Sequence, residues 1–379
     1  MFHYFDNAAT TQVRPEAARA ALEAMTAGWG NPSSVYSFGR EAAARVRGWR
    51  ADVSAALGCQ PEELYFTSCG TESDNWAVYG SLEANRRKGK HILTTAIEHA
   101  AVLEPCKALE AQGYEVTRLQ PDSQGRITPR QVADALRPDT VLVSMMLVNN
   151  EVGSILPVRE AVQAVRASGC PALIHCDAIQ GFLKVPFTPR ELGVDLLSVS
   201  GHKIHAPKGV GALYIRKGLK FPPLLRGGGQ EGGLRSGTEA TGQIAAFAAA
   251  AKLGRASMEA DLARMAQLKD YLIRRLGEEV PRAKVLVEDG APHILPVTLP
   301  GYKSEVVVRL LGDRGICLSS GSACHKGKPS HVFAALNLPK GERDGALRVS
   351  LSYDTTREDA DALILGLKEA AGALFTSLS

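Results

Sequence analysis

The chain has 379 residues, of which 45% are hydrophobic and 22% are charged. This composition is close to that of average globular proteins and excludes a disordered chain, and the length predicts two domains or one large α/β unit. The formal net charge of +4 is small for this size and argues against a dedicated nucleic-acid binder.

Short apolar segments that alternate with helical patterns predict a mainly parallel sheet. The strand candidates are residues 64–67, 91–95, 115–119, 141–148, 173–176, 196–199 and 212–215. The helical patterns between them include residues 40–57, 72–83, 100–111 and 158–167. Near-continuous apolar strands separated by amphipathic helices are typical of a sheet that is covered on both faces. We therefore expect an α/β fold whose large domain has a mainly parallel seven-stranded sheet flanked by helices.

The last third of the chain has a different pattern. A long helical segment, rich in Ala, Leu, Arg and Lys, covers residues 244–276. Strands are expected near residues 295–299 and 347–351, and a closing helix near residues 358–375. This order predicts a smaller α+β domain, with the boundary inside the long helix. The large domain is expected to span residues 13–255, and the small domain residues 1–12 and 256–379.

Two charged residues follow predicted strands. Asp177 comes directly after strand 173–176, and strand 196–199 leads to Lys203. Ligands of such sheets bind beyond the carboxyl ends of the strands. A lysine that forms a Schiff base and a carboxylate that pairs with a pyridinium nitrogen are what a protein must supply to pyridoxal phosphate. Taken singly, a surface lysine and an ion-paired or helix-capping aspartate would explain the two residues as well.

Further polar residues lie at strand ends. The turn Ser68–Ser73 leads into a helix, whose N-terminus suits a phosphate group, although a capping box would look similar. His99 and Asn150 each follow a strand, and Gln180 lies three residues after Asp177. A capping histidine, a turn and a solvent-facing glutamine are the alternatives. The joint occurrence of these residues at strand ends favours a single ligand site.

The seven cysteines are an odd number and show no spacing typical of disulfides or zinc sites. We therefore expect a reducing, cytoplasmic setting, and we predict no signal peptide and no membrane-spanning segment. Cys324 differs from the others because it lies among small residues and next to His325 and Lys326. Such an electropositive and polar setting favours the thiolate form of a cysteine. Cys324 is therefore the candidate nucleophile, on a loop that we expect to be mobile.

With these residues in place, the chain resembles the cysteine desulfurases of the NifS/IscS type, which are class V members of the fold type I pyridoxal phosphate enzymes. The resemblance covers essentially the whole chain. The motifs that carry it are residues 4–11 (YFDNAATT), 30–34 (GNPSS), 71–75 (TESDN), 98–99 (EH), 148–151 (VNNE), 177–180 (DAIQ), 200–203 (SGHK), 235–238 (RSGT) and 319–324 (SSGSAC).

The resemblance implies a role for each motif residue at the cofactor. Lys203 would bind pyridoxal phosphate covalently, Asp177 would keep its ring nitrogen protonated, and His99 would stack on the ring. Gln180 and Asn150 would contact the side of the ring that carries the hydroxyl. Thr238 would reach the cofactor phosphate of a neighbouring subunit, which implies a homodimer. Within one subunit, the phosphate would be held by Gly70, Thr71, Ser200 and His202.

The resemblance also implies the reaction. Asn31 and Arg348 would bind the carboxylate of L-cysteine, a task for which a planar guanidinium is suited. The thiolate of Cys324 would attack the substrate sulfur and become a persulfide, and alanine would be released. The sulfur would then pass to an acceptor protein, such as an iron–sulfur scaffold, for cluster assembly or thiolation. No resident metal is implied, although Cys324 could ligate an iron–sulfur cluster transiently.

Two other functions are compatible with these residues. A selenocysteine lyase, or another class V enzyme such as a small aminotransferase, would use the same lysine and aspartate, but an aminotransferase has no need of Cys324. A non-enzymatic sulfur carrier or assembly scaffold would use the Cys324 loop for docking. The intact set of Lys203, Asp177 and His99 argues against the scaffold.

Overall fold

The computed structural model describes residues 2–320 and 330–373. Its larger part is built on a seven-stranded sheet, and the pairing order is β2-β8-β7-β6-β5-β3-β4. β8 pairs antiparallel with both of its neighbours, whereas the remaining pairs are parallel. The expected mainly parallel sheet is thus confirmed. Its strands are β2 (Leu64–Thr67), β3 (His91–Thr95), β4 (Glu115–Leu119), β5 (Thr140–Ser144), β6 (Leu173–Asp177), β7 (Leu196–Ser200) and β8 (Gly211–Ile215).

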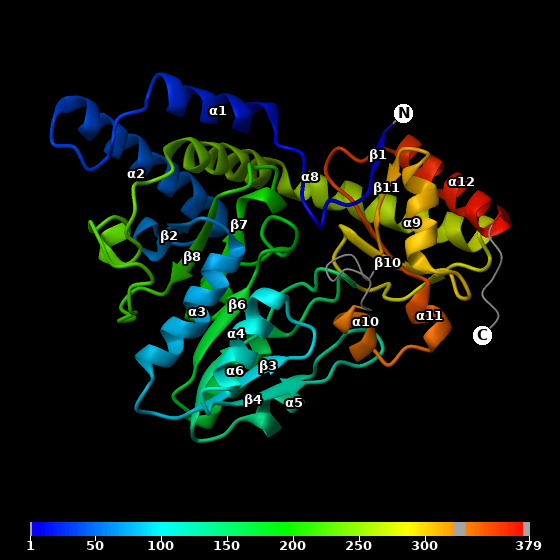
Figure 1. The fold of residues 1–379 in the computed structure, drawn as a ribbon, viewed down its shortest axis with the longest axis horizontal. Coiled ribbons are helices and arrows are strands. Elements are labelled where there is room, and N and C mark those ends of the chain that lie inside the picture. Colours follow the sequence, from blue (N-terminus) through cyan, green and yellow to red (C-terminus); the bar gives the residue numbers. More distant parts are fainter. Residues whose placement is uncertain (1, 321–329, 374–379) are drawn as a thin grey trace.

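Helices alternate with these strands and continue after them. Figure 1 shows that α1 and α2 lie beside the first half of the long helix α8, whereas α9 and α12 lie at the other end of the molecule. The helices are α1 (Pro15–Thr26), α2 (Ser37–Leu57), α3 (Gly70–Ala84), α4 (Ala100–Glu110), α5 (Pro129–Ala135), α6 (Val158–Ser168), α7 (Pro189–Leu192), α8 (Thr241–Glu279), α9 (Ser304–Gly312), α10 (His331–Ala335), α11 (Lys340–Asp344) and α12 (Arg357–Ala373).

Apolar residues cover both faces of the seven-stranded sheet. Ile92 and Leu142 pack on one face with residues of α3 and α4. Their neighbours Leu93 and Val143 pack on the other face with residues of α2, α6 and α8. Successive residues of a strand point to opposite faces, so a sheet that is covered on both faces needs an apolar residue at nearly every strand position.

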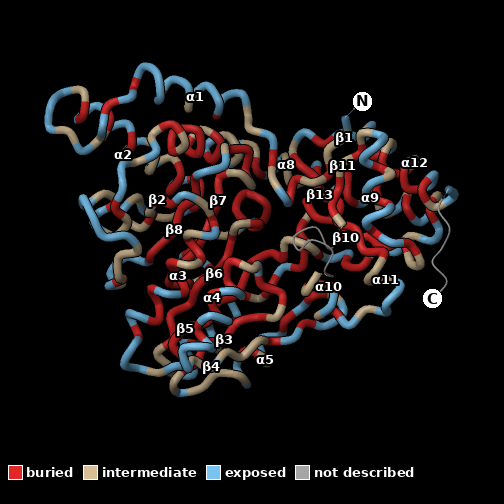
Figure 2. The backbone as a smooth tube through the Cα atoms, viewed as in Figure 1, coloured by how far each residue is buried: buried red, intermediate tan, exposed pale blue. Residues whose placement is uncertain are grey.

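A second hydrophobic core surrounds a smaller antiparallel sheet with the order β12-β13-β10-β9. Figure 2 shows buried chain in both parts of the molecule. Helix α8 connects them, since its Met258 belongs to the first core and its Met265 to the second. The boundary between residues 255 and 256 stays a prediction. The strands of the smaller sheet are β9 (Lys284–Val285), β10 (Ile294–Thr298), β12 (Ser319–Ser320) and β13 (Ala346–Ser350).

Strand β5 ends earlier than the sequence pattern predicts. The expected strand covered residues 141–148, but β5 ends at Ser144. Beyond this point the amide of Met146 donates to Oε1 of the buried Glu98 at 2.9 Å. Met145 and Leu147 still donate to backbone oxygens of β6, so the carboxyl group replaces a neighbouring strand on the opposite side only. An apolar sequence pattern does not reveal such a partner.

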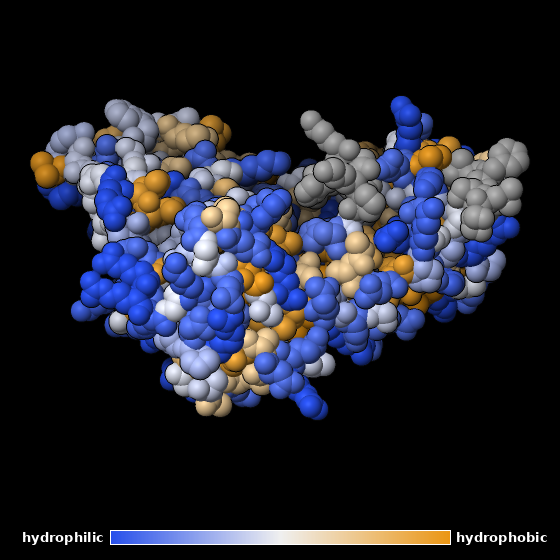
Figure 3. Space-filling model, turned by 60° about the horizontal axis from the view of Figure 1, so that its bottom comes forward, coloured by the Kyte–Doolittle hydropathy of each residue, from blue (hydrophilic) through white to orange (hydrophobic). Residues whose placement is uncertain are grey.

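The surface of the molecule is mainly hydrophilic on the face that Figure 3 shows, and apolar residues form separate patches there. Among the described residues, no helix combines the length and the apolar character that a membrane span requires.

The N-terminal segment joins the two cores. Strand β1 (His3–Tyr4) pairs in parallel with β11 (Ile316–Cys317). Phe5 then packs in the second core, and Ala8 packs in the first. We call residues 4–11 the N-terminal strap, because this short stretch is attached to both parts of the chain.

Phe5→Ala should lower the free energy of unfolding by roughly 3–5 kcal/mol, because the ring is fully buried and its loss leaves a cavity. Phe2→Ala is the matched control, since Phe2 is 68% exposed. Urea unfolding of both variants measures the difference. Equal stability of the two variants would contradict the burial of the strap.

Candidate active site

A cavity of about 450 Å³ lies at the edge of the sheet where β6 and β7 end. Its wall also includes residues of the N-terminal strap and of the smaller sheet. Residues that lie far apart in the sequence thus meet at one place. The lining residues that the sequence singled out are Gly70, Thr71, His99, Asn150, Asp177, Gln180, Ser200, His202, Lys203 and Arg348.

Asp177 is the last residue of β6 and is only 4% exposed. Its Oδ1 accepts a hydrogen bond from the amide of Ile179 at 2.9 Å. Burial raises the pKa of the Asp177 carboxyl to about 6, whereas this amide and the charge of Lys203 act in the opposite direction. A cationic group in the cavity would favour the ionised carboxylate further.

Lys203 lies in the short 3₁₀ turn Gly201–Lys203 that follows β7. Its Nζ donates to the carbonyl oxygens of Ala8 at 2.6 Å and Ala9 at 2.8 Å. Nε2 of Gln180 donates to the same Ala8 oxygen at 2.8 Å. The strap carbonyls therefore hold two of the predicted site residues in place.

The first turn of α3 and Ser200 form a cradle that fits an anion. Among the described residues, no side chain caps the N-terminus of α3, and Oγ of the buried Ser200 has no hydrogen-bond partner. Gly70 allows a close approach here, because a Cβ atom on it would lie 2.3 Å from Cδ1 of Ile179. Free amides at a helix N-terminus and an unpaired hydroxyl are suitable ligands for a phosphate group.

His99 caps the N-terminus of α4, which is the alternative role that the sequence left open for it. Its Nδ1 accepts a hydrogen bond from the amide of Ala101 at 3.1 Å. Burial, together with the charges of Lys203 and His331, lowers the pKa of His99 to about 4. The ring is therefore neutral near pH 7, and its proton lies on Nε2 because Nδ1 is an acceptor. Capping does not remove His99 from the cavity, which it also lines.

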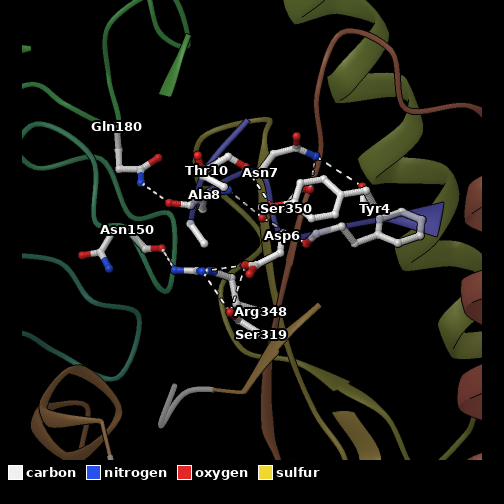
Figure 4. Close-up of polar contacts among 12 residues, drawn as sticks. Tyr4, Asp6, Asn7, Ala8, Thr10, Asn150, Gln180, Ser319, Arg348 and Ser350 are labelled. Atoms are coloured by element: carbon white, nitrogen blue, oxygen red, sulfur yellow. Dashed lines mark hydrogen bonds and ion pairs between the residues drawn. The ribbon is translucent and has the colours of Figure 1, made fainter. Parts of the chain in front are cut away.

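Arg348 comes from β13 of the smaller sheet and is 7% exposed. Its Nη2 donates to Oδ1 of Asp6 at 2.8 Å, and its Nη1 donates to the backbone oxygen of Asn150 at 2.9 Å. Figure 4 shows the guanidinium between these two groups. The side chain is thus a fixed, buried cation at the cavity wall.

Sequence reasoning gave no role to three other residues at the site. Asp6 and His331 line the cavity, and Glu98 lies fully buried next to it. Asp6 lies in the motif 4–11 and Glu98 in the motif 98–99, so the sequence did mark these two residues without indicating their contacts. A single acidic residue in a segment without periodicity does not indicate what it contacts.

Two of the sequence-predicted residues that the structure describes are not found at this cavity. Thr238 and Asn31 do not belong to its wall within one chain. Asn31 was expected to bind substrate, but its Oδ1 accepts a local hydrogen bond from the amide of Ser33 at 2.9 Å. Cys324 lies outside the described residues.

Comparisons with known proteins agree with this arrangement. A model of the aminotransferase class-V family matches residues 3–363. The cysteine desulfurase IscS of Methanosarcina thermophila is 42% identical over 368 residues, which are 95% of this chain and 90% of the relative. A cysteine desulfurase of Nostoc sp. is 41% identical over 365 residues, with 95% of this chain and 90% of the relative covered.

Solved structures have the same fold. A NifS-like protein superposes with a TM-score of 0.93 at 35% identity, and the match covers 99% of this chain and 100% of that chain. The structure of SspA in complex with cysteine superposes with a TM-score of 0.81 at 31% identity, and it covers 93% of this chain and 100% of that chain.

Glu98→Gln should remove a pH-dependent loss of stability. Burial raises the pKa of the Glu98 carboxyl from 4.5 to about 8, so the folded protein keeps this proton in a range where the unfolded chain releases it. The contribution of Glu98 to wild-type stability therefore falls between pH 4.5 and 8 and levels off above. The variant keeps an Oε1 acceptor and does not ionise.

Urea unfolding at pH 5 and pH 9 measures this effect. The stability of Glu98→Gln relative to wild type should increase by roughly 4 kcal/mol between these two conditions. The control is Glu41→Gln at an exposed position, which should show no such trend. A constant difference between Glu98→Gln and wild type would refute the buried neutral carboxyl.

Proposed function

Because the chain belongs to the class-V aminotransferase family, we propose that it is a cysteine desulfurase, which converts L-cysteine into L-alanine and bound sulfur. The observation that carries the proposal is that Lys203, Asp177, His99 and Arg348 meet in one cavity. The relatives of this chain that are named cysteine desulfurase match 95% of its length and support the proposal.

The donor set of the cavity fits pyridoxal phosphate. Lys203 would anchor it, and Asp177 would pair with its ring nitrogen. The N-terminus of α3 and the unpaired Oγ of Ser200 would hold its phosphate. When bound, the cofactor supplies an aldehyde that reacts with amines and a ring that accepts electrons.

The residues of this chain would then have separate tasks. Arg348 would bind the carboxylate of L-cysteine, and the Lys203 amine would move the proton at Cα. Neutral His99 would supply a proton from Nε2. The Cys324 thiolate would attack the substrate sulfur, so that a sulfur–sulfur bond forms and the carbon–sulfur bond breaks. The sulfur remains on Cys324 as a persulfide, and the carbon product takes up a proton to become alanine.

We also propose that the sulfur passes from Cys324 to an acceptor protein in the cytoplasm, such as an iron–sulfur scaffold. Its use would be cluster assembly or thiolation. The relatives named cysteine desulfurase IscS support this direction.

The active unit is proposed to be a homodimer. Thr238, which would serve the neighbouring subunit, does not line the cavity of its own chain. The segment that follows α1 also leaves Trp29, Val35 and Tyr36 exposed by 68%, 85% and 60%. Large exposed apolar residues that lie together indicate an interaction surface.

The double substitution Val35→Asp and Tyr36→Asp should convert the dimer into a monomer, because two charges would be buried in the contact. Light scattering of the wild type should give twice the chain mass of 40.4 kDa. Leu365→Asp is the control, since Leu365 is 57% exposed on α12, away from this segment. A monomeric wild type would contradict the proposal.

Lys203→Ala should abolish both the yellow colour of the purified protein and the release of alanine, because it removes the anchor of the cofactor. Cys324→Ala should keep the colour and lose turnover of L-cysteine. Absorbance near 400 nm and an alanine assay measure both properties. Cys170→Ala is the control, because Cys170 does not line the cavity.

A colourless wild type, or a Cys324→Ala variant with undiminished rate, would overturn the proposed function. Turnover of L-selenocysteine by the same variants distinguishes a selenocysteine lyase from a cysteine desulfurase, because the lyase would retain activity without Cys324.

A further inference from the structure

The guanidinium of Arg348 is held by acceptors from three segments of the chain. Nη2 donates to Oδ1 of Asp6 at 2.8 Å and to Oγ of Ser319 at 3.1 Å, and Nη1 donates to the backbone oxygen of Asn150 at 2.9 Å. Oγ of Ser319 in turn donates to the same oxygen of Asp6 at 2.9 Å. Of these three acceptors, Asp6 is the one that carries a charge.

These contacts leave two N–H groups of the guanidinium without a partner among the described residues. A guanidinium has five N–H groups. Three of them are used by Asp6, Ser319 and Asn150, and Nε of Arg348 is buried without a partner among the described residues. The remaining donors are Nε–H and one N–H on Nη1. Nε has almost no accessible surface, so the N–H on Nη1 is the donor left for a ligand in the cavity that Arg348 lines.

The backbone around Asp6 is fixed by neighbouring contacts. Nδ2 of Asn7 donates to the backbone oxygen of Ser350 at 3.0 Å, and the amide of Ala8 donates to Oγ of Ser350 at 2.9 Å. Ser350 lies two residues after Arg348 on β13. Figure 4 shows these strap residues beside the strand that carries Arg348. The carboxylate of Asp6 is therefore presented to Arg348 from a backbone that is bonded to the same strand.

We propose that Asp6 is a positioning residue for substrate binding: its carboxylate fixes the orientation of Arg348, so that the free N–H of Nη1 receives the substrate carboxylate. This inference rests on the proposed function, in which Arg348 binds that carboxylate. Ion-paired hydrogen bonds are shorter and stronger than neutral ones. An uncharged acceptor at position 6 would hold the guanidinium less firmly, and the bound geometry would be lost.

The test compares Asp6→Asn with wild type, both as holoenzyme. The variant should raise KM for L-cysteine about tenfold and change kcat less than twofold, because the strap and the reacting groups stay in place. The dissociation constant for L-alanine, measured by calorimetry, should rise by a similar factor. The cofactor absorbance and the melting temperature should stay close to those of the wild type.

Asp289→Asn is the matched control, because it removes the same charge from an exposed pair with Arg126. Ser319→Ala should raise the L-alanine dissociation constant by no more than about threefold, since it removes one neutral contact. Asp6→Glu should restore part of the affinity that Asp6→Asn loses. If Asp6→Asn does not fold, the L-alanine dissociation constants of Ser319→Ala and Asp6→Glu are compared with that of the wild type and test the same inference.

An unchanged dissociation constant for L-alanine in these variants would overturn the inference, as would a loss confined to kcat. The proposed function fails differently, because a wild type that releases no alanine from L-cysteine would refute it. The calorimetric comparison of L-alanine binding still tests Asp6 in that case.

Discussion

The geometry of the site depends on the parallel arrangement of β5, β6 and β7. Parallel strands end at the same edge of a sheet, so the residues that directly follow them lie close together there. Asp177 ends β6, and Lys203 follows β7 by one short turn. The register of the sheet thus brings the acid and the amine to one cavity, and the remaining elements complete its wall.

This arrangement concentrates buried ionisable groups. Burial raises the pKa values of Asp177 and Glu98 and lowers those of His99 and His202. Each shift records a cost to the folded state, since the charged form of the group is disfavoured. The apolar cores on both faces of the sheet supply the stability that offsets this cost. The site therefore has a defined charge pattern before any ligand binds.

The smaller sheet, which the second core surrounds, contributes Arg348 to the wall of the cavity. Arg348 lies on β13 of the smaller sheet, and the N-terminal strap connects that sheet to the carboxyl ends of the large one. Phe5 is anchored in the second core, while Ala8 accepts hydrogen bonds from Lys203 and Gln180. Through this strap, the Arg348 side and the Lys203 side of the cavity are connected to each other.

The sequence alone determined the seven strands of the large sheet, apart from the end of β5, and the pair of Asp177 and Lys203. Apolar periodicity is local, and strand ends have a known place in such a sheet. The sequence did not reveal that Glu98 accepts from the amide of Met146 or that Asp6 holds Arg348, a contact across 342 residues. Such partners depend on how segments that lie far apart in the sequence pack together. Only the tertiary structure decides which distant polar groups share a buried space, because a buried charge must find its partner wherever the chain happens to bring one.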